Sequence, residues 1–131
     1  MTESKQDQPD GEEPAQPAER RPTPNPMAQE AEALVKEGIT LCRRARWRDA
    51  IEPLHRALEL DPTNAAAHYQ LGEAYNQTDR LAEALAAYEA AARAQPTHWR
   101  ALKGIGIILD RLGRPVEANE AYQRARAAFG R

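Results

Sequence analysis

Apolar side chains recur at helical spacing between residues 27 and 131. Ile105, Ile108 and Leu112, for example, follow the i, i+3, i+7 spacing that puts side chains on one face of an α-helix. Short polar or proline-containing segments interrupt this pattern, and residues 61–64 form one of them. The stretches between the interruptions predict six helices, at 27–44, 48–60, 65–77, 81–94, 99–112 and 115–129.

The predicted helices form pairs because the chain repeats with a period of 34 residues. When residues 31–64, 65–98 and 99–131 are laid over one another, five columns are identical in all three copies. These columns are Ala33/Ala67/Ala101, Gly38/Gly72/Gly106, Arg46/Arg80/Arg114, Ala50/Ala84/Ala118 and Ala57/Ala91/Ala125. A fixed period of this length indicates stacked copies of one helical hairpin, each of which buries its apolar face against the next.

Small residues and prolines in the repeat indicate how each hairpin is built. Glycine in the first helix and alanine in the second predict a close approach of the two helices where their axes cross. Pro62 and Pro96 lie just beyond the second helices and predict where those helices end. Asn25 followed by Pro26 predicts the start of the first helix, because asparagine caps helices well and proline suits the first helical position.

The second copy resembles the tetratricopeptide repeat. The matching residues are His68 (where the family usually has Trp), Leu71, Gly72, Tyr75, Ala84, Tyr88 and Pro96. The first copy matches at Gly38, Ala50, Leu54 and Pro62, and the third at Gly106, Ala118 and Tyr122. The resemblance covers about residues 29–130. It implies an all-α, right-handed solenoid of three helix-turn-helix hairpins that binds other proteins.

Polar residues occupy both outer faces of the predicted stack. The first copy carries Glu37 where the second carries Leu71, and the third copy carries Asn119 where the first carries Ile51. Terminal repeats need such polar faces to stay soluble. The pattern therefore predicts a complete stack of three copies, with Phe129 as an exposed point for self-association at its end.

Residues 1–26 differ from the repeats in composition. They hold six of the ten prolines, and six acidic against three basic residues, whereas residues 27–131 hold 14 acidic and 15 basic residues. A segment with so little apolar bulk cannot bury enough surface to offset its ordering entropy. We therefore predict a disordered, acidic, proline-rich tail at 1–26 and a three-repeat domain at 27–131.

The overall composition narrows the class of protein further. The formal net charge of -2 gives no general reason to expect nucleic acid binding, and no stretch of about 18 apolar residues predicts a membrane span. A single cysteine permits no intrachain disulfide, so a reducing, cytoplasmic location is predicted. Fifteen arginines against three lysines favour a GC-rich bacterial source.

In tetratricopeptide proteins the first helices of successive repeats line a concave groove. The resemblance maps this groove, together with Glu32 and Ala66, onto Val35, Ile39, Cys42, Tyr69, Glu73, Asn76, Arg100, Lys103, Ile107 and Asp110. Val35, Ile39, Tyr69 and Ile107 are apolar where the repeat core does not require it. Exposed apolar side chains gathered in a concavity mark interaction sites. We therefore predict that the groove binds a protein or peptide partner, with Tyr69 as its main anchor.

Some family members clamp a C-terminal carboxylate with Lys and Asn side chains on these helices. The corresponding residues here are Val35, Ile39, Glu73, Lys103 and Ile107, and only Lys103 fits. The resemblance therefore does not extend to the clamp and argues against chaperone-tail binding of that kind. A mixed groove with an apolar end suits an extended or helical segment that carries an apolar anchor.

Basic residues near the turns within the hairpins suggest an alternative function. Seven of them line one predicted edge: Arg43, Arg44, Arg46, Arg48, Arg80, Arg111 and Arg114. Such an edge suits phosphate groups, so a nucleic-acid-associated accessory role is the second interpretation. Acidic neighbours such as Asp49 and Glu83 favour the simpler interpretation of a solvated, ion-paired edge.

No pattern in the chain predicts catalysis, a metal site or a cofactor. The three histidines lack the i, i+4 spacing of helical metal ligands. Cys42 has no histidine near it in sequence, although Arg43 and Arg44 are expected to lower its pKa slightly. The sequence therefore predicts a non-enzymatic adaptor or small chaperone-like module that is monomeric or weakly self-associating.

Overall fold

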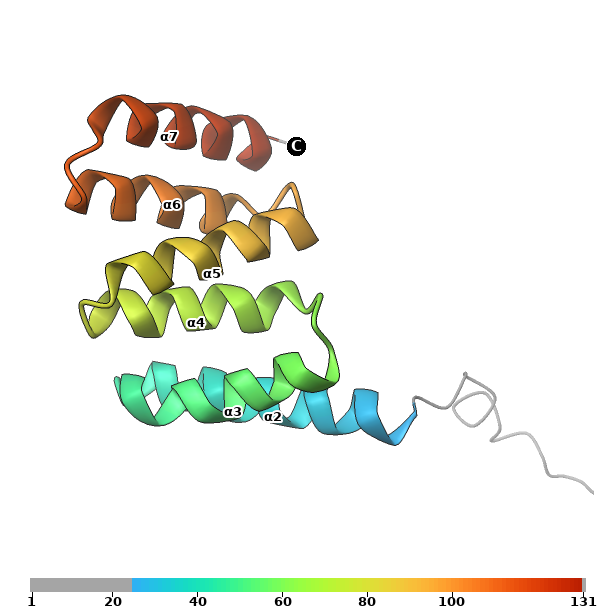
Figure 1. Cartoon of the computed structure of the whole chain (residues 1–131). Coiled ribbons are helices and arrows are strands. Elements are labelled where there is room, and N and C mark those ends of the chain that lie inside the picture. The colour runs from blue at the N-terminus through green and yellow to red at the C-terminus, as the bar shows by residue number, and fades with distance from the viewer. Residues whose placement is uncertain (1–24, 131) are drawn as a thin grey trace, which may run out of the picture.

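The computed structural model describes residues 25–130, which form six α-helices and no strand. The helices are α2 (Pro26–Arg43), α3 (Trp47–Leu60), α4 (Ala65–Gln77), α5 (Leu81–Ala94), α6 (Trp99–Arg111) and α7 (Pro115–Phe129). Consecutive helices pair as α2/α3, α4/α5 and α6/α7, and the pairs stack into an all-α solenoid (Figure 1). All six predicted helices are confirmed, and their ends lie within one residue of the predicted ones. The predicted tail lies outside the described residues, apart from Asn25 and Pro26.

Each first helix begins with a side-chain cap. Asn25 caps α2 as predicted: its Oδ1 accepts a hydrogen bond of 2.6 Å from the amide of Ala28, and Pro26 is the first helical residue. Asn64 and His98 cap α4 and α6 in the same way, at 3.0 and 3.1 Å from the amide nitrogen three residues on. These caps give a partner to an amide that has none within the helix.

The turn inside each hairpin contains a residue in the left-handed region. Ala45, Asp79 and Gly113 occupy the same repeat position, with φ of 60°, 61° and 76°. Glycine adopts this conformation without strain, whereas alanine carries a penalty of about 1 kcal/mol there. The three turns therefore share one geometry although their residues differ, and this position is not among the identical columns.

The glycine column confirms the predicted close approach within each hairpin. A Cβ built on Gly38 would lie 2.4 Å from the side chain of Leu54, which is too close for any real contact. Gly72 and Gly106 have the same relation to Tyr88 and Tyr122, at 2.6 Å. Only a residue without a side chain lets the bulky residue of the second helix lie flat against the first helix.

Tyr88 is also the main contact between the second and third copies. Its ring lies against both Gly72 and Gly104, the sixth residue of the third copy, and a Cβ on Gly104 would lie 2.6 Å from it. The side chain is 1% exposed, and its hydroxyl donates a hydrogen bond of 2.5 Å to Glu73. The ring is therefore enclosed by two helices of its own repeat and one of the next.

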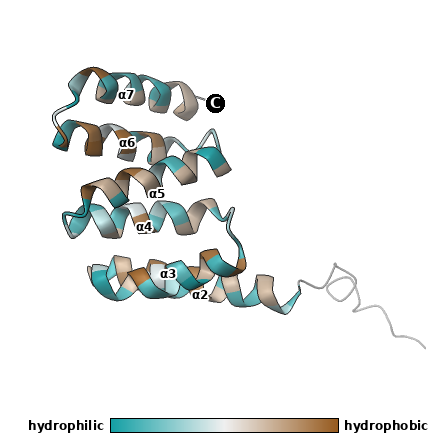
Figure 2. Cartoon of the chain, in the orientation of Figure 1, coloured by the Kyte–Doolittle hydropathy of each residue, from teal (hydrophilic) through white to brown (hydrophobic). Residues whose placement is uncertain are grey.

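The two outer faces of the stack are more polar than its inner interfaces, as predicted. Glu37 on α2 and Asn119 and Arg126 on α7 are exposed, whereas Leu71 on α4 is buried. Figure 2 shows large hydrophobic segments on α6 but alternating hydrophilic and hydrophobic segments on α7. No helix within residues 25–130 has the length and apolar character needed to cross a membrane.

Candidate functional site

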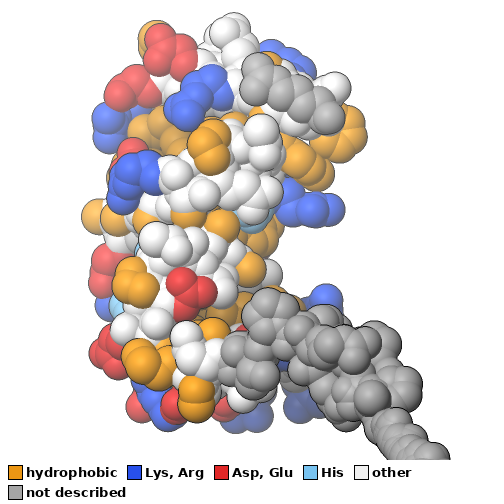
Figure 3. Space-filling view, turned by 90° about the vertical axis from the view of Figure 1, so that its right-hand side faces the viewer, with side chains coloured by type: hydrophobic (Ala, Val, Ile, Leu, Met, Phe, Trp, Pro, Cys, Tyr) orange, Lys and Arg blue, Asp and Glu red, His pale blue; other side chains and the backbone are white. Residues whose placement is uncertain are grey.

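Helices α2, α4 and α6 are neighbours in the stack and lie along its hollowed side, on the right in Figure 3. Hydrophobic and basic side chains gather on this side. We call the surface formed by the exposed and partly exposed members of the predicted groove set on these helices the groove face. Arg100, Lys103 and Asp110 are exposed on it, and five more of the predicted residues are partly exposed: Ile39, Tyr69, Glu73, Asn76 and Ile107.

Val35 and Cys42 do not belong to the groove face, so this part of the prediction is wrong. Both are core residues, with exposures of 6% and 7%. The Sγ of Cys42 lies 4.0 Å from the backbone oxygen of Gln70 on α4. Because each first helix packs on the one before it, the side chains of α2 that point toward α4 are covered rather than open to a ligand.

Burial also determines the chemistry of Cys42. Burial, together with the nearby carboxylate of Glu73, raises the pKa of the Cys42 thiol to about 11, the opposite of the lowering expected from its arginine neighbours. At pH 8 the reactive thiolate is then about 100-fold scarcer than for a thiol with the ordinary pKa of 9.0. We expect Ellman's reagent to modify Cys42 at least about tenfold more slowly in the native protein than in guanidinium chloride. Equal rates would show that the thiol is accessible and ordinary.

Tyr69 lies at the centre of the groove face and is partly buried. Its ring centroid is 5.8 Å from that of Tyr88 and 5.0 Å from that of His98. Burial, followed by the negative charge of Glu73, raises the pKa of Tyr69 to about 12, so its hydroxyl stays protonated at physiological pH. The prediction that the core does not need Tyr69 is therefore only partly right, because its ring packs against Tyr88 and against His98, the residue that caps α6.

Three polar residues of the groove face are held by hydrogen bonds within the stack. Glu73 accepts its bond from Tyr88, and Asp110 accepts one of 2.9 Å from the hydroxyl of Tyr122. The backbone oxygen of Asn76 accepts a bond of 3.0 Å from the guanidinium of Arg111. These bonds fix the acceptors in place, so Glu73 and Asp110 present carboxylates at defined positions.

Arg100, Lys103 and Ile107 give the groove face its open contact area on α6. The guanidinium carbon of Arg100 lies 4.7 Å from the ring centroid of Trp99, which holds this cation beside the aromatic surface. Lys103 and Ile107 lie one and two turns further along the same helix, the first exposed and the second partly so. The third repeat therefore combines two cations with an accessible apolar side chain.

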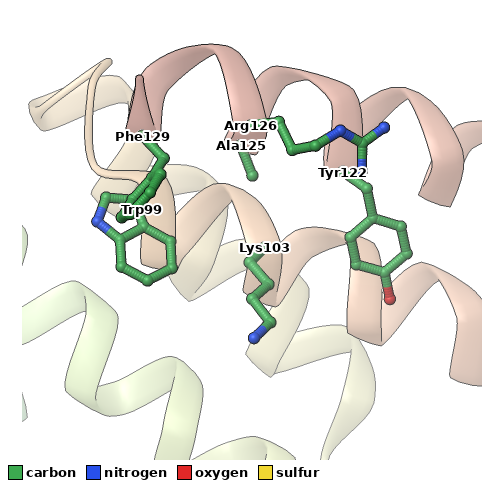
Figure 4. A pocket seen from close by; sticks show the side chains of 6 residues that line it. All are labelled: Trp99, Lys103, Tyr122, Ala125, Arg126 and Phe129. Carbon is green, nitrogen blue, oxygen red and sulfur yellow. The ribbon is translucent and has the colours of Figure 1, made fainter. Parts of the chain in front are cut away.

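A pocket of about 470 Å³ continues the groove face beyond α6. We call it the end pocket; it is lined by Trp99, Lys103, Tyr122, Ala125, Arg126 and Phe129 (Figure 4). Trp99 and Phe129 meet edge to face, with ring centroids 4.9 Å apart, and Phe129 is 66% exposed. Phe129 is exposed as predicted, whereas the pocket beside it was not predicted from the sequence. The sequence does carry a signal for this pocket, because the third copy has Lys103 and Phe129 where the second copy has Tyr69 and Gln95.

The seven arginines predicted to line one edge of the stack form what we call the arginine edge. Four of them are ion-paired. Arg46, Arg80 and Arg114 each bind the acidic residue three positions on, and the nitrogen–oxygen distances of these pairs are 2.8, 2.5 and 2.7 Å. Arg111 pairs with Asp79 in the neighbouring hairpin. The repeated arginine column thus belongs to a pairing motif at the start of each second helix. This pairing leaves fewer cations on the edge available for phosphate groups.

Each histidine has a hydrogen bond within the fold. The Nε2 of His55 lies 2.6 Å from the hydroxyl of Tyr75, and the Nε2 of His68 lies 2.9 Å from the backbone oxygen of Pro62. His98 caps α6, and burial lowers its pKa. Among residues 25–130 no group of three potential metal ligands occurs. The histidines therefore have structural roles in the stack.

Three hairpins related by one repeat, with a shared groove along their first helices, define a helical-repeat solenoid. The family model described as tetratricopeptide repeat matches residues 35–98 and 78–130. The chain therefore belongs to the tetratricopeptide repeat family. This fold is a scaffold and points to an interaction module rather than to a catalytic one.

Curated relatives match part of the chain. The chain is 36% identical over 78 residues, 60% of its length, to a probable UDP-N-acetylglucosamine–peptide N-acetylglucosaminyltransferase, SPINDLY, of Solanum lycopersicum, and covers 8% of that protein. It is 26% identical to anaphase-promoting complex subunit 3 of Schizosaccharomyces pombe over 101 residues, which are 77% of this chain and 15% of that protein. The chain thus spans about a tenth of the length of such relatives.

Solved structures match most of the chain. A crystal structure of MamA superposes with a TM-score of 0.74 and 28% identity, covering 79% of this chain and 60% of that one. The second tetratricopeptide domain of Spaghetti (RPAP3), bound to the HSP90 peptide SRMEEVD, has a TM-score of 0.74 and 21% identity and covers 77% of this chain and 94% of that one. These likenesses support the fold.

Proposed function

We propose that the chain is an adaptor that binds a segment of a partner protein on its groove face. The observation that carries this proposal is the composition of the groove face around Tyr69. The partly buried ring of Tyr69 on α4 lies one turn from Glu73, whose repeat position holds the partly exposed Ile39 on α2 and Ile107 on α6. Aromatic residues of this kind, half supported by the core, serve as anchors because little entropy is lost on binding.

The charges on the groove face indicate the chemistry of the bound segment. Lys103 and Arg100 lie on α6, and Glu73 lies at the centre, held by the hydroxyl of Tyr88. A segment with an apolar side chain over Tyr69 and an acidic residue toward α6 complements this pattern. Such a segment lies along the groove in an extended or helical form.

Two structural neighbours support peptide binding by this fold, because both domains of Spaghetti (RPAP3) hold the HSP90 peptide SRMEEVD. This chain lacks the Lys and Asn set that clamps a terminal carboxylate, apart from Lys103. We therefore propose an internal segment, rather than a chaperone tail, as the ligand. A cytoplasmic location fits this role.

Affinity capture with the full chain as bait tests the proposal. The groove variant Ile39→Ala with Ile107→Ala removes apolar side chains from α2 and α6 on the groove face but keeps Tyr69 itself, which the stack needs. We expect partner binding to weaken by about 2 kcal/mol, or about 30-fold in Kd, because both are partly exposed apolar side chains of the groove face. Captured proteins are identified by mass spectrometry, and the Kd of each is then measured with purified partner.

The control variant carries the same kind of change away from the groove face. Met27→Ala with Val116→Ala shortens two exposed apolar side chains, which are 54% and 73% exposed, and should bind partners as the wild type does. Unchanged binding by the groove variant would refute the proposal. Capture that is lost after nuclease treatment but kept in the groove variant would instead favour the arginine edge and nucleic acid.

A further inference from the structure

Aromatic rings and cations meet at the edge of the stack where the first helices begin. Trp99 opens α6 and is partly exposed, with the guanidinium of Arg100 4.7 Å from its ring centroid. The ring of His98, just before it, lies 5.0 Å from that of Tyr69 on α4. Lys103 is exposed one turn further along α6. These five residues form what we call the aromatic edge, at the margin of the groove face that Figure 3 presents to the viewer.

Charge changes sign across this edge, from α2 to α6. One repeat position holds the exposed residues Glu32, Ala66 and Arg100 on the three first helices. Lys103 adds a second cation on α6, and neither it nor Arg100 forms an ion pair with any other residue between 25 and 130. A ligand that crosses the edge therefore gains from basic groups over α2 and acidic groups over α6.

The sequence that precedes α2 carries such groups in the matching order. Residues 10–13 hold three acidic residues and no basic one. Pro14 and Pro17 follow with the P-x-x-P spacing of segments that dock on aromatic surfaces. Arg20 and Arg21 come next and are nearest to α2. The order acidic, proline-containing, basic complements the order cationic, aromatic, acidic that leads from α6 to α2.

The chain is long enough to make this contact. In Figure 1 α2 and α6 begin on the same side of the stack, so the chain enters α2 at the aromatic edge. Two steps between neighbouring first helices, of roughly 8–10 Å each, separate α2 from α6 by about 20 Å. The eight residues from Pro17 to Asn25 span at most about 26 Å. Pro17 therefore reaches Trp99, and residues 10–13 reach the cations of α6.

The arginine edge is the other cationic surface that the acidic residues could meet. It lies at the opposite end of the first helices, roughly 27 Å along the 18-residue α2. Pro17 does not reach that far from Asn25, so acidic residues alone could bind there. The aromatic edge is the surface that can use the acidic residues and the prolines together.

We propose that residues 10–21, which we call the tail segment, dock on the aromatic edge of their own chain. Pro14 and Pro17 pack on the rings of Trp99 and Tyr69, and the acidic residues lie over α6. The tail segment has no large apolar side chain for the anchor position at Tyr69. A partner segment with both an acidic and an apolar residue therefore displaces it, and this regulatory role rests on the proposed function of the groove face.

The tail segment of a second copy has the same chemistry but lacks the tether. A short linker gives a tethered segment an effective concentration of the order of millimolar. At micromolar protein concentration the segment of the same chain therefore occupies the aromatic edge first.

Paramagnetic relaxation enhancement in the full chain tests where the tail segment lies. A nitroxide is attached to Gln8→Cys, while Cys42 stays unlabelled at neutral pH because it is buried and its pKa is raised to about 11. We expect the amide signals of Trp99 and Lys103 to lose more intensity than those of the arginine edge. About 1 M sodium chloride should weaken the effect, because it shortens the screening length to about 3 Å.

Three variants locate the contact. The edge variant Arg100→Gln with Lys103→Gln should lose the selective broadening. The control variant Arg43→Gln with Arg44→Gln removes two exposed cations of the arginine edge and should keep it. The tail variant should lose it as well, and its substitutions are Asp10→Asn, Glu12→Gln, Glu13→Gln, Pro14→Ala and Pro17→Ala.

A fluorescently labelled peptide of residues 8–21 tests the competition. In fluorescence anisotropy we expect it to bind the tail variant at least about tenfold more tightly than the wild-type chain, because the wild-type tail segment already occupies the site. Adding the edge substitutions to the tail variant should weaken binding at least about tenfold.

Four outcomes would overturn the proposal. Broadening may be equal at the two edges, or it may disappear in the control variant instead of the edge variant. The peptide may bind the wild-type chain and the tail variant equally. Broadening in an isotope-labelled chain without nitroxide, mixed with nitroxide-bearing chains, would assign the contact to a second copy. These measurements use no partner, so a failure of partner capture on the groove face is a separate result.

Discussion

Replacing Tyr88 with alanine is expected to lower the free energy of unfolding by about 4 kcal/mol. The ring is 1% exposed and lies against both Gly72 and Gly104, so its removal leaves a cavity that neither backbone can fill. The change also removes the hydroxyl that donates to Glu73. Small domains are stabilised by about 5–15 kcal/mol, so the loss is a large share of the total. Urea unfolding followed by circular dichroism measures it.

Two further variants separate the causes of this loss. Tyr122→Ala is expected to cost about half as much, because the outer side of Tyr122 faces the end pocket instead of a further helix. Tyr88→Phe keeps the ring and removes only the hydrogen bond to Glu73, which is worth about 1 kcal/mol. Equal losses for Tyr88→Ala and Tyr122→Ala would show that the packing of Tyr88 between two repeats contributes little.

The features that the sequence predicts well are those that every repeat needs. Gly38, Gly72 and Gly106 are identical because each faces a bulky side chain of its own hairpin at a distance that excludes a Cβ. The helix ends follow from local chemistry, as with Asn25 before Pro26. Such contacts lie within one repeat or between like repeats, so the periodicity itself encodes them.

The features that the sequence predicts poorly depend on what lies next to a repeat. Val35 and Cys42 occupy groove positions in sequence, yet α4 covers them, while Lys103 at the position of Val35 is exposed because no described helix lies beyond it. The left-handed turn residue escapes a residue pattern because Ala45 and Gly113 adopt the same φ region. Only the stacked structure distinguishes these cases.

Gly104 illustrates the same point, and its replacement by valine is the second variant with a large expected effect. The repeat position holds Lys36, Gln70 and Gly104 in the three copies, so the glycine is not a repeated column. A β-branched side chain there would meet the ring of Tyr88, since even a Cβ would lie at 2.6 Å. We expect a loss of about 3 kcal/mol in the free energy of unfolding, measured by urea unfolding.

Lys36→Val is the matched control, because it places the same side chain at the same repeat position on the exposed outer face of α2. Its effect should stay within about 0.5 kcal/mol. Tyr88→Leu combined with Gly104→Val should cost less than the sum of the single variants by more than about 1 kcal/mol, because leucine makes room for the valine. Additive costs would mean that the ring of Tyr88 is not what excludes a side chain from Gly104. Coupling would instead show that one glycine and one tyrosine, 16 residues apart in the sequence, fix how the third repeat sits on the second.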